Sequence, residues 1–175
     1  DLRKQKPELK VLLSIGGWGS GRFSEMAAND EYRCAFAADC DRVVKEFALD
    51  GIDIDWEYPT SSMANISSSP DDTENFTLLM QDIRAAIGNE KELTLATVAS
   101  ARYIDFKAIL PSVDFVNIMA YDMASAPKHH SALYPSGHSG DITSDGAVTA
   151  HLKAGVPPSK LVMGMPFYGR GGDGY

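Results

Sequence analysis

The chain has 175 residues, of which 44% are hydrophobic and 23% charged, so it carries enough apolar material for the core of one domain. Its formal net charge of -8 argues against nucleic acid or an anionic membrane as the main partner, because both attract concentrated positive charge. No apolar run reaches the length that crosses a bilayer, so we expect an uncharged substrate and no membrane association.

Short apolar runs alternate with helical patterns along the chain. In chain order, the sequence predicts a strand at 11–15, a helix that begins at residue 29 or 30, a strand at 52–56, a helix over 76–87, a strand at 93–98, a short helix at 105–110, a strand at 115–119, a helix over 144–154 and a strand at 161–165. The length and β-branched content of the five apolar runs favour strands buried on both faces, as in a parallel sheet.

Strict alternation is typical of two α/β architectures, a doubly wound open sheet and a closed (β/α)8 TIM barrel. Polar residues such as Ser14, Tyr121 and Tyr168 favour the barrel, because they stand at or just past the carboxyl ends of predicted strands, where barrel enzymes assemble their sites. No glycine-rich phosphate loop follows the first strand, which weakens the nucleotide-binding alternative. Five strands cannot close an eight-stranded barrel, so we expect an incomplete barrel whose first and last strands are open edges.

The segment DGIDIDWE at residues 50–57 places carboxylates at alternate positions. Asp53, Asp55 and Glu57 share one face of an extended strand, roughly 7 Å apart, while apolar side chains occupy the other face. Carboxylates this close cannot all ionise independently in a sheltered site, so at least one should keep its proton toward neutral pH, as a general acid must. A solvated strand face is a weaker interpretation, and so is a magnesium or calcium site, since nothing nearby indicates a phosphate substrate. Asp50 is interpreted as a turn or cap residue.

Four motifs carry a resemblance to a known family. The segment 50–57 with the following Tyr58-Pro59 resembles the catalytic signature of family 18 glycoside hydrolases, the chitinase family. SIGGW at 14–18, MAYD at 119–122 and GMPFYGR at 164–170 resemble its third, sixth and seventh barrel-strand motifs, in the expected order. The resemblance implies that residues 1–175 form a partial catalytic domain with about strands 3 to 7 of the barrel. It also implies that the full-length protein is secreted and monomeric.

The resemblance assigns catalytic roles to four side chains. Glu57 would protonate the glycosidic oxygen and later activate water. This family is an exception to the usual pair of carboxylates, because the acetamido group of the substrate acts as the nucleophile. Asp55 would hold the acetamido N–H and stabilise the oxazolinium intermediate, Asp53 would share a proton with Asp55, and Tyr121 would orient the acetamido oxygen. No metal or other cofactor is required.

The same resemblance suggests residues that bind the substrate, chitin or chitooligosaccharides. Sugar rings stack on aromatic side chains, and Trp18 fits a platform on the leaving-group side. The predicted substrate-binding residues are Trp18, Tyr58, Met119, Asp122 and Tyr168. Packing in the core remains an alternative for Trp18 and Tyr168, because aromatic residues with one polar group suit both environments.

The expected function is endo-acting hydrolysis of β-1,4-linked N-acetylglucosamine polymers with retention of configuration. A chitin-binding lectin is an alternative, although such proteins typically lack the acid equivalent to Glu57. An endo-β-N-acetylglucosaminidase that cuts N-glycans and an inactive truncated fragment are further alternatives. We expect the isolated 175-residue chain to be weakly stable and poorly active.

Cysteine and histidine carry no predicted chemistry. Cys34 and Cys40 fall on one predicted helix, too far apart for a disulfide, and are interpreted as small core residues. The four histidines show no ligand spacing and are expected at the surface without a role: His129, His130, His138 and His151. Two glycosylation sequons, at Asn65 and Asn75, suit a secreted protein but often arise by chance.

Overall fold

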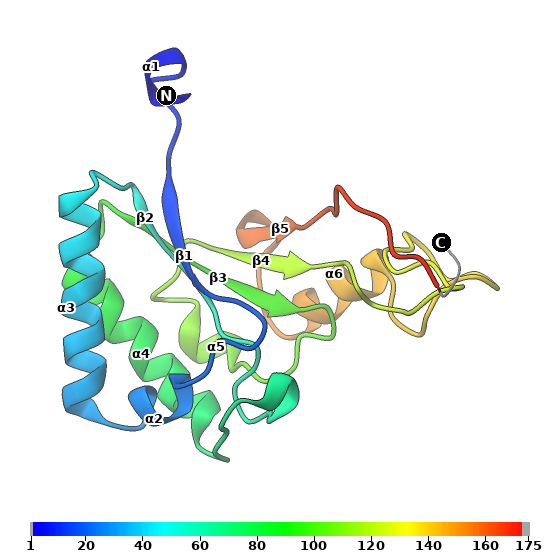
Figure 1. Cartoon of the computed structure of the whole chain (residues 1–175), viewed down its shortest axis with the longest axis horizontal. Helices are drawn as coiled ribbons and strands as arrows, with labels where there is room; N and C mark the ends of the chain where they lie inside the picture. Colours follow the sequence, from blue (N-terminus) through cyan, green and yellow to red (C-terminus); the bar gives the residue numbers. More distant parts are fainter. Residues whose placement is uncertain (1, 173–175) are drawn as a thin grey trace.

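The computed structural model describes residues 2–172, which form a five-stranded parallel sheet covered by helices (Figure 1). The strands are β1 (Leu12–Gly16), β2 (Gly51–Asp55), β3 (Glu92–Val98), β4 (Phe115–Met119) and β5 (Leu161–Met163). Each strand pairs in parallel with the next strand along the chain, in the order β1-β2-β3-β4-β5. The sheet does not close on itself, which confirms the prediction of an incomplete α/β barrel.

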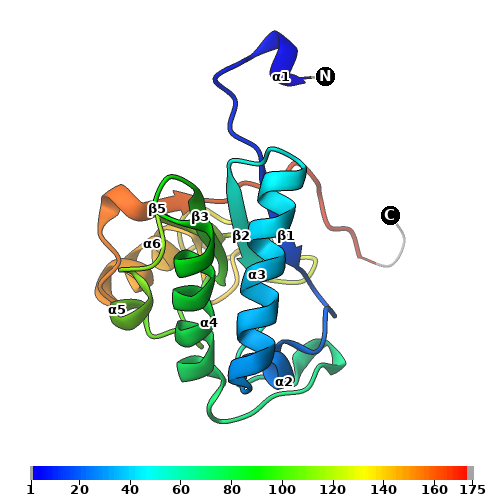
Figure 2. The same ribbon diagram turned by 90° about the vertical axis from the view of Figure 1, so that its left-hand side faces the viewer.

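The helices connect successive strands. They are α1 (Leu2–Gln5), α2 (Phe23–Ala27), α3 (Asp30–Glu46), α4 (Asp72–Ile87), α5 (Phe106–Ile109) and α6 (Ser144–Lys153), with short 3₁₀ turns at Met63–Asn65 and Pro158–Lys160. α3 and α4 lie side by side against the sheet, and α1 projects away from the rest of the chain (Figures 1 and 2). Within the described part of the chain, no helix is both long and apolar enough to span a membrane.

The core lies between the sheet and the helices. Ile52, Ile54 and Leu95 are fully buried on the helix side of the central strands. Trp56, just past β2, stacks on Phe23 at 5.4 Å between ring centroids and meets Phe76 edge-on at the same distance. These apolar positions alternate with polar ones along β2, so the carboxylates at 53 and 55 face the other side of the sheet.

The outer strands depart from the expectation that every strand is buried on both faces. Leu13 of β1 is 40% exposed, and Val162 of β5 is 44% exposed. The reason is that β1 and β5 each pair with only one neighbour among the described residues. Their position confirms the predicted open edges of the sheet.

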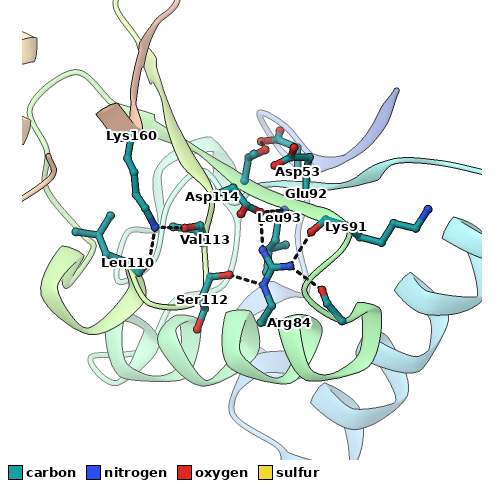
Figure 3. Close-up of polar contacts among 12 residues, drawn as sticks. Asp53, Arg84, Lys91, Glu92, Leu93, Leu110, Ser112, Val113, Asp114 and Lys160 are labelled. Atoms are coloured by element: carbon teal, nitrogen blue, oxygen red, sulfur yellow. Dashed lines mark hydrogen bonds and ion pairs between the residues drawn. The ribbon is translucent and has the colours of Figure 1, made fainter. Parts of the chain in front are cut away.

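Partly buried charges with several hydrogen bonds each stabilise the amino end of the sheet (Figure 3). The Arg84 guanidinium of α4 donates to Asp114 at 2.6 Å and to three carbonyl oxygens, those of Gly88, Lys91 and Ser112. The Leu93 backbone N–H donates to the same oxygen of Asp114, at 2.7 Å. Lys160 donates to the carbonyls of Leu110 and Val113 in the same way. These contacts fix the entry of the chain into β3, β4 and β5.

Two predictions about cysteine and histidine are wrong. Cys34 is exposed on α3 rather than in the core, whereas Cys40 is buried, and burial raises the pKa of the Cys40 thiol to about 12. His151 is completely buried rather than at the surface. Its Nδ1 lies 2.7 Å from the Ala147 carbonyl and its Nε2 lies 3.3 Å from the Thr97 hydroxyl, so it joins α6 to β3 as a satisfied core histidine.

Candidate active site

A cleft of about 830 Å³ opens at the carboxyl ends of the strands. Loops that follow β1, β2, β3, β4 and β5 all contribute to its lining. Asp55 and Glu57 lie in this cleft together with Tyr121 and Asp122, so residues from β2 and from the end of β4 face one space. This is the end of a parallel α/β barrel at which catalytic groups assemble.

Asp53 lies beneath the cleft and is held by side chains from three other strands. Its Oδ2 accepts from the Ser14 hydroxyl of β1 at 2.7 Å, and its Oδ1 accepts from the Thr94 hydroxyl of β3 at 2.6 Å and from the Asn117 amide of β4 at 3.2 Å. Strand register produces two of these contacts, because Asp53 stands directly opposite Ser14 and Thr94. Three donors therefore fix this carboxylate in one orientation.

Asp55 is the least satisfied carboxylate in the cleft. Its Oδ1 is buried and has no hydrogen-bond partner among the described residues. Burial, followed by the charges of Glu57 and Asp53, raises the pKa of Asp55 to about 7. An unpaired buried oxygen next to two other carboxylates is poised to accept a hydrogen bond from a ligand or to keep a proton.

The backbone of β1 approaches Asp55 closely. The Gly17 N–H donates to the Asp55 carbonyl at 2.8 Å. Gly16 has φ +125°, and a Cβ at this residue would lie 2.0 Å from the same carbonyl oxygen. Gly16, the first glycine of the SIGGW motif, is therefore a steric requirement of this site.

Glu57 follows β2 and is half-buried. Burial raises the pKa of Glu57, the charge of Asp122 raises it further, and a hydrogen bond with Tyr58 opposes both effects. Burial also raises the pKa of Tyr121, so its hydroxyl stays protonated and can donate. The cleft thus combines a carboxyl group whose pKa is raised by burial with a phenolic donor.

Asp122 is the anchor of a polar network beside the cleft. It accepts from Arg170 Nε at 2.7 Å, from Arg170 Nη2 at 2.6 Å and from the Tyr168 hydroxyl at 2.8 Å. Hydrogen bonds from Arg170 lower the pKa of Asp122, which therefore remains ionised. The Tyr168 ring meets Tyr121 edge-on at 6.2 Å, so the network also packs against the phenol in the cleft.

Aromatic side chains form one wall of the cleft. Tyr58 meets the 60% exposed Trp18 edge-on at 6.4 Å and stacks on Tyr103 at 5.4 Å, with 16° between the ring planes. The Arg102 guanidinium lies 5.5 Å from the centroid of the Tyr103 ring. Ala101 and Tyr103 have left-handed backbones, with φ of 58° and 74°. The Thr73 hydroxyl holds the Tyr103 carbonyl at 3.0 Å, so the strained loop after β3 is anchored to α4.

The loop between Tyr58 and α4 is organised by one buried carboxylate. Asp72 is completely buried and accepts from the Thr60 and Ser69 backbone N–H groups, at 3.0 and 2.8 Å. It also accepts from the Ser24 hydroxyl of α2 at 2.7 Å. Both ends of the loop therefore meet at a single side chain, and Met63, between them, lines the cleft.

The structure brings most predicted site residues together. Seven of them line the cleft: Trp18, Asp55, Glu57, Tyr58, Met119, Tyr121 and Asp122. Asp53 lies beneath it, and Tyr168, 46% exposed, holds Asp122 rather than lining the cleft. Met63, Arg102, Tyr103 and Arg170 are among the lining residues that sequence reasoning missed. Arg170 ends the GMPFYGR motif, so the motif contained a signal for it, whereas the other three stand in no motif.

Comparison with known proteins identifies the family. The model of glycosyl hydrolases family 18 matches residues 1–174. The chain belongs to this family. It is 38% identical over 202 residues to chitinase A1 of Niallia circulans, covering 99% of this chain and 28% of that protein.

Solved structures agree with this assignment. The chitinase domain of the spore coat protein CotE from Clostridium difficile matches with a TM-score of 0.93 and 42% identity, over 97% of this chain and 52% of that one. A family 18 N-acetylglucosaminidase from Paenibacillus barengoltzii matches with a TM-score of 0.87 and 40% identity, over 93% and 52%. These matches confirm the predicted family and barrel-type fold, and the chain spans about half the length of these solved relatives.

Proposed function

We propose that these residues form part of the catalytic domain of a chitinase that hydrolyses β-1,4-linked N-acetylglucosamine polymers with retention of configuration. The observation that carries the proposal is the buried, unpaired Oδ1 of Asp55 beside Glu57 in a cleft that also contains the Tyr121 hydroxyl. A buried carboxyl oxygen without a partner, next to a second carboxyl group whose pKa is raised by burial, suits a substrate that supplies its own N–H donor and its own nucleophile.

The proposed reaction has two steps. Glu57 donates its proton to the glycosidic oxygen while the acetamido carbonyl oxygen of the same sugar attacks the anomeric carbon, so the C–O bond to the leaving sugar breaks and an oxazolinium ion forms. Asp55 accepts the acetamido N–H, and Tyr121 donates to the acetamido oxygen. Glu57 then takes a proton from water, which attacks the anomeric carbon from the side that the leaving sugar occupied, while the bond between this carbon and the acetamido oxygen breaks and the acetamido group is restored.

Glu57→Gln tests the proposal in the complete protein, meaning the whole gene product that contains these 175 residues. We expect the variant to lose about 10³-fold or more of its turnover of chitooligosaccharides, because the amide has no proton to transfer, while oligosaccharide binding is retained. Glu74→Gln, at an exposed position of α4, is the matched control and should keep full turnover. Unchanged turnover in Glu57→Gln would remove Glu57 from this role, and a wild-type protein that binds without cutting would indicate a lectin.

A second candidate is the exo-acting release of single N-acetylglucosamine units. The 40% identity to the Paenibacillus barengoltzii N-acetylglucosaminidase favours it. Early products from a hexasaccharide separate the two modes, since endo cleavage gives dimers to tetramers at once and exo cleavage gives monomer and pentamer. Either function on an insoluble polymer requires export of the protein, so activity found only in the cytosol would contradict both.

A further inference from the structure

The turn that follows β4 is fastened by two residues from a later loop. The Ser131 hydroxyl donates to the Ala120 carbonyl at 2.7 Å, and the Met123 N–H donates to the His130 carbonyl at 2.9 Å. Between these two contacts, His130 Nδ1 accepts the Asp122 backbone N–H at 3.1 Å. The segment 120–123, which carries Tyr121 and Asp122 into the cleft, is therefore held from both sides by residues 130 and 131.

The contact with His130 acts on a strained position. Asp122 has φ 53°, a left-handed conformation that a residue with a side chain rarely adopts. This conformation directs the carboxylate to Arg170 and Tyr168 and leaves the backbone N–H to be satisfied by another group. The imidazole supplies that acceptor.

The imidazole itself is confined. Its side chain is only 13% exposed, so the expectation of a surface position is wrong for His130. Its ring stacks on Tyr168 at 5.2 Å with 22° between the planes. Because a backbone N–H can only donate, Nδ1 must be unprotonated and the proton must lie on Nε2.

Protonation of His130 would reverse the direction of this contact. An imidazolium ion has two N–H donors and no acceptor, so the Asp122 N–H would lose its partner. The new Nδ1–H would instead face the Asp122 carboxylate, whose Oδ1 is 3.4 Å away and already accepts from Arg170. The charged and titratable groups around the ring are Asp122 from the β4 turn and Tyr168 and Arg170 from the segment after β5.

We propose that neutral His130 is a positioning residue that holds the β4 turn in its active geometry, and that its protonation lowers the rate on the acidic side of the pH profile. The proposal rests on the proposed hydrolase function. His130 acts through Asp122 and Tyr121 and does not itself line the cleft.

The test uses two substitutions in the complete protein and the neutral tetramer of N-acetylglucosamine as substrate, with kcat/KM measured from pH 4 to 9. His130→Asn keeps an acceptor at the position of Nδ1 but cannot titrate, so it should retain most of the rate at neutral pH and show a smaller acidic decline than the wild type, the remaining decline being due to protonation of Asp55. His130→Leu has no acceptor, and kcat/KM should fall by up to about 100-fold at every pH. His138→Leu, at an exposed position of the same loop, is the matched control and should behave like the wild type.

A nitrogen-15 spectrum of the wild-type histidine side chains provides a readout that is independent of activity. We expect Nδ1 of His130 to be unprotonated at neutral pH and its resonance to shift over the pH range in which kcat/KM declines. A protonated Nδ1 at neutral pH would overturn the proposal, as would identical pH profiles for the wild type and His130→Asn. If His130→Leu does not fold, the nitrogen-15 spectrum and the pH profile of His130→Asn still test the proposal. A wild-type protein that hydrolyses no chitooligosaccharide would overturn the proposed function as well, whereas an active wild type with unaffected variants would overturn only the role of His130.

Discussion

The two ends of the sheet differ in how their charged groups are hydrogen-bonded. At the amino end, Arg84 donates to Asp114 and to three carbonyl oxygens, and Asp114 also accepts from the Leu93 N–H. At the carboxyl end, Asp55 keeps a buried oxygen without a partner, and burial raises the pKa of both Asp55 and Glu57. Non-glycine residues in left-handed conformations also occur there, at Tyr103 and Asp122.

The difference separates stability from chemistry. Satisfied buried charges hold the strands in place but have no free capacity for a ligand. Unsatisfied oxygens and strained turns cost folding free energy and are available for a substrate. A change at the amino end should therefore affect unfolding more than turnover, and a change at the carboxyl end should do the reverse.

The largest effect on stability is expected for Arg84→Met. Because the substitution leaves the partly buried Asp114 and several carbonyls without their donor, we expect the free energy of unfolding of the complete protein to fall by about 3 kcal/mol. Urea denaturation measures it, and turnover well below the unfolding temperature should be unchanged. Arg42→Met removes two exposed ion pairs within α3 and should cost less than about 1 kcal/mol. Equal losses of unfolding free energy in the two variants would contradict a special stabilising role for Arg84.

Asp55→Asn should raise the free energy of unfolding at high pH, whereas Arg84→Met lowers it. The pKa of Asp55 is raised from 3.8 to about 7 in the folded state, so the folded protein binds the proton more tightly than the unfolded chain does. Wild-type stability should therefore fall as the pH rises from 4 to 7, and the amide abolishes this loss. After allowance for solvent screening, we expect Asp55→Asn to be more stable than the wild type by about 2 kcal/mol at pH 8 and equal to it at pH 3.

Thermal unfolding of both proteins across this pH range measures the effect, and turnover of Asp55→Asn should be strongly reduced throughout. A stability difference that does not change with pH would show that Asp55 ionises in the folded protein as it does in the unfolded chain.

A smaller effect is expected for Tyr103→Ala. This substitution removes the ring that stacks on Tyr58 and supports the aromatic wall, a contact worth about 1 kcal/mol, so KM for a chitin hexamer should rise about 5-fold. Tyr32→Ala, at an exposed position of α3, provides the control. If both variants keep the wild-type KM, the wall beyond Tyr58 does not contact the substrate.

Local signals in the sequence predicted much of this fold. The strand at 115–119 has its predicted limits, α4 ends before Gly88 as expected, and Asn29 caps α3 through the Tyr32 N–H. Each of these features depends on neighbours within a few residues. The alternation of carboxylates along β2 likewise identified Asp55 and Glu57, because the period of a strand is a local property.

The residues that sequence reasoning missed depend on distant partners. Tyr103 meets Tyr58 across 45 positions, and His151 reaches Thr97 across 54. His130 accepts the N–H of Asp122, eight residues earlier, and the left-handed conformation of Asp122 is not predictable from a glycine at that position. Such contacts arise from tertiary packing, and neither periodicity nor motif spacing encodes them.

The buried Asp72 has a consequence for how such a cleft can diversify. Because one carboxylate fastens the backbone at Thr60 and Ser69, the residues between them form an interchangeable unit whose ends stay fixed. Replacements at the exposed Met63 can alter the wall of the cleft without displacing Tyr58 on one side or α4 on the other, provided that the buried Ile66 keeps its place in the core. Glu57 is thereby separated from sequence changes near Met63, so the wall of the cleft can change while the residues at its base stay in place.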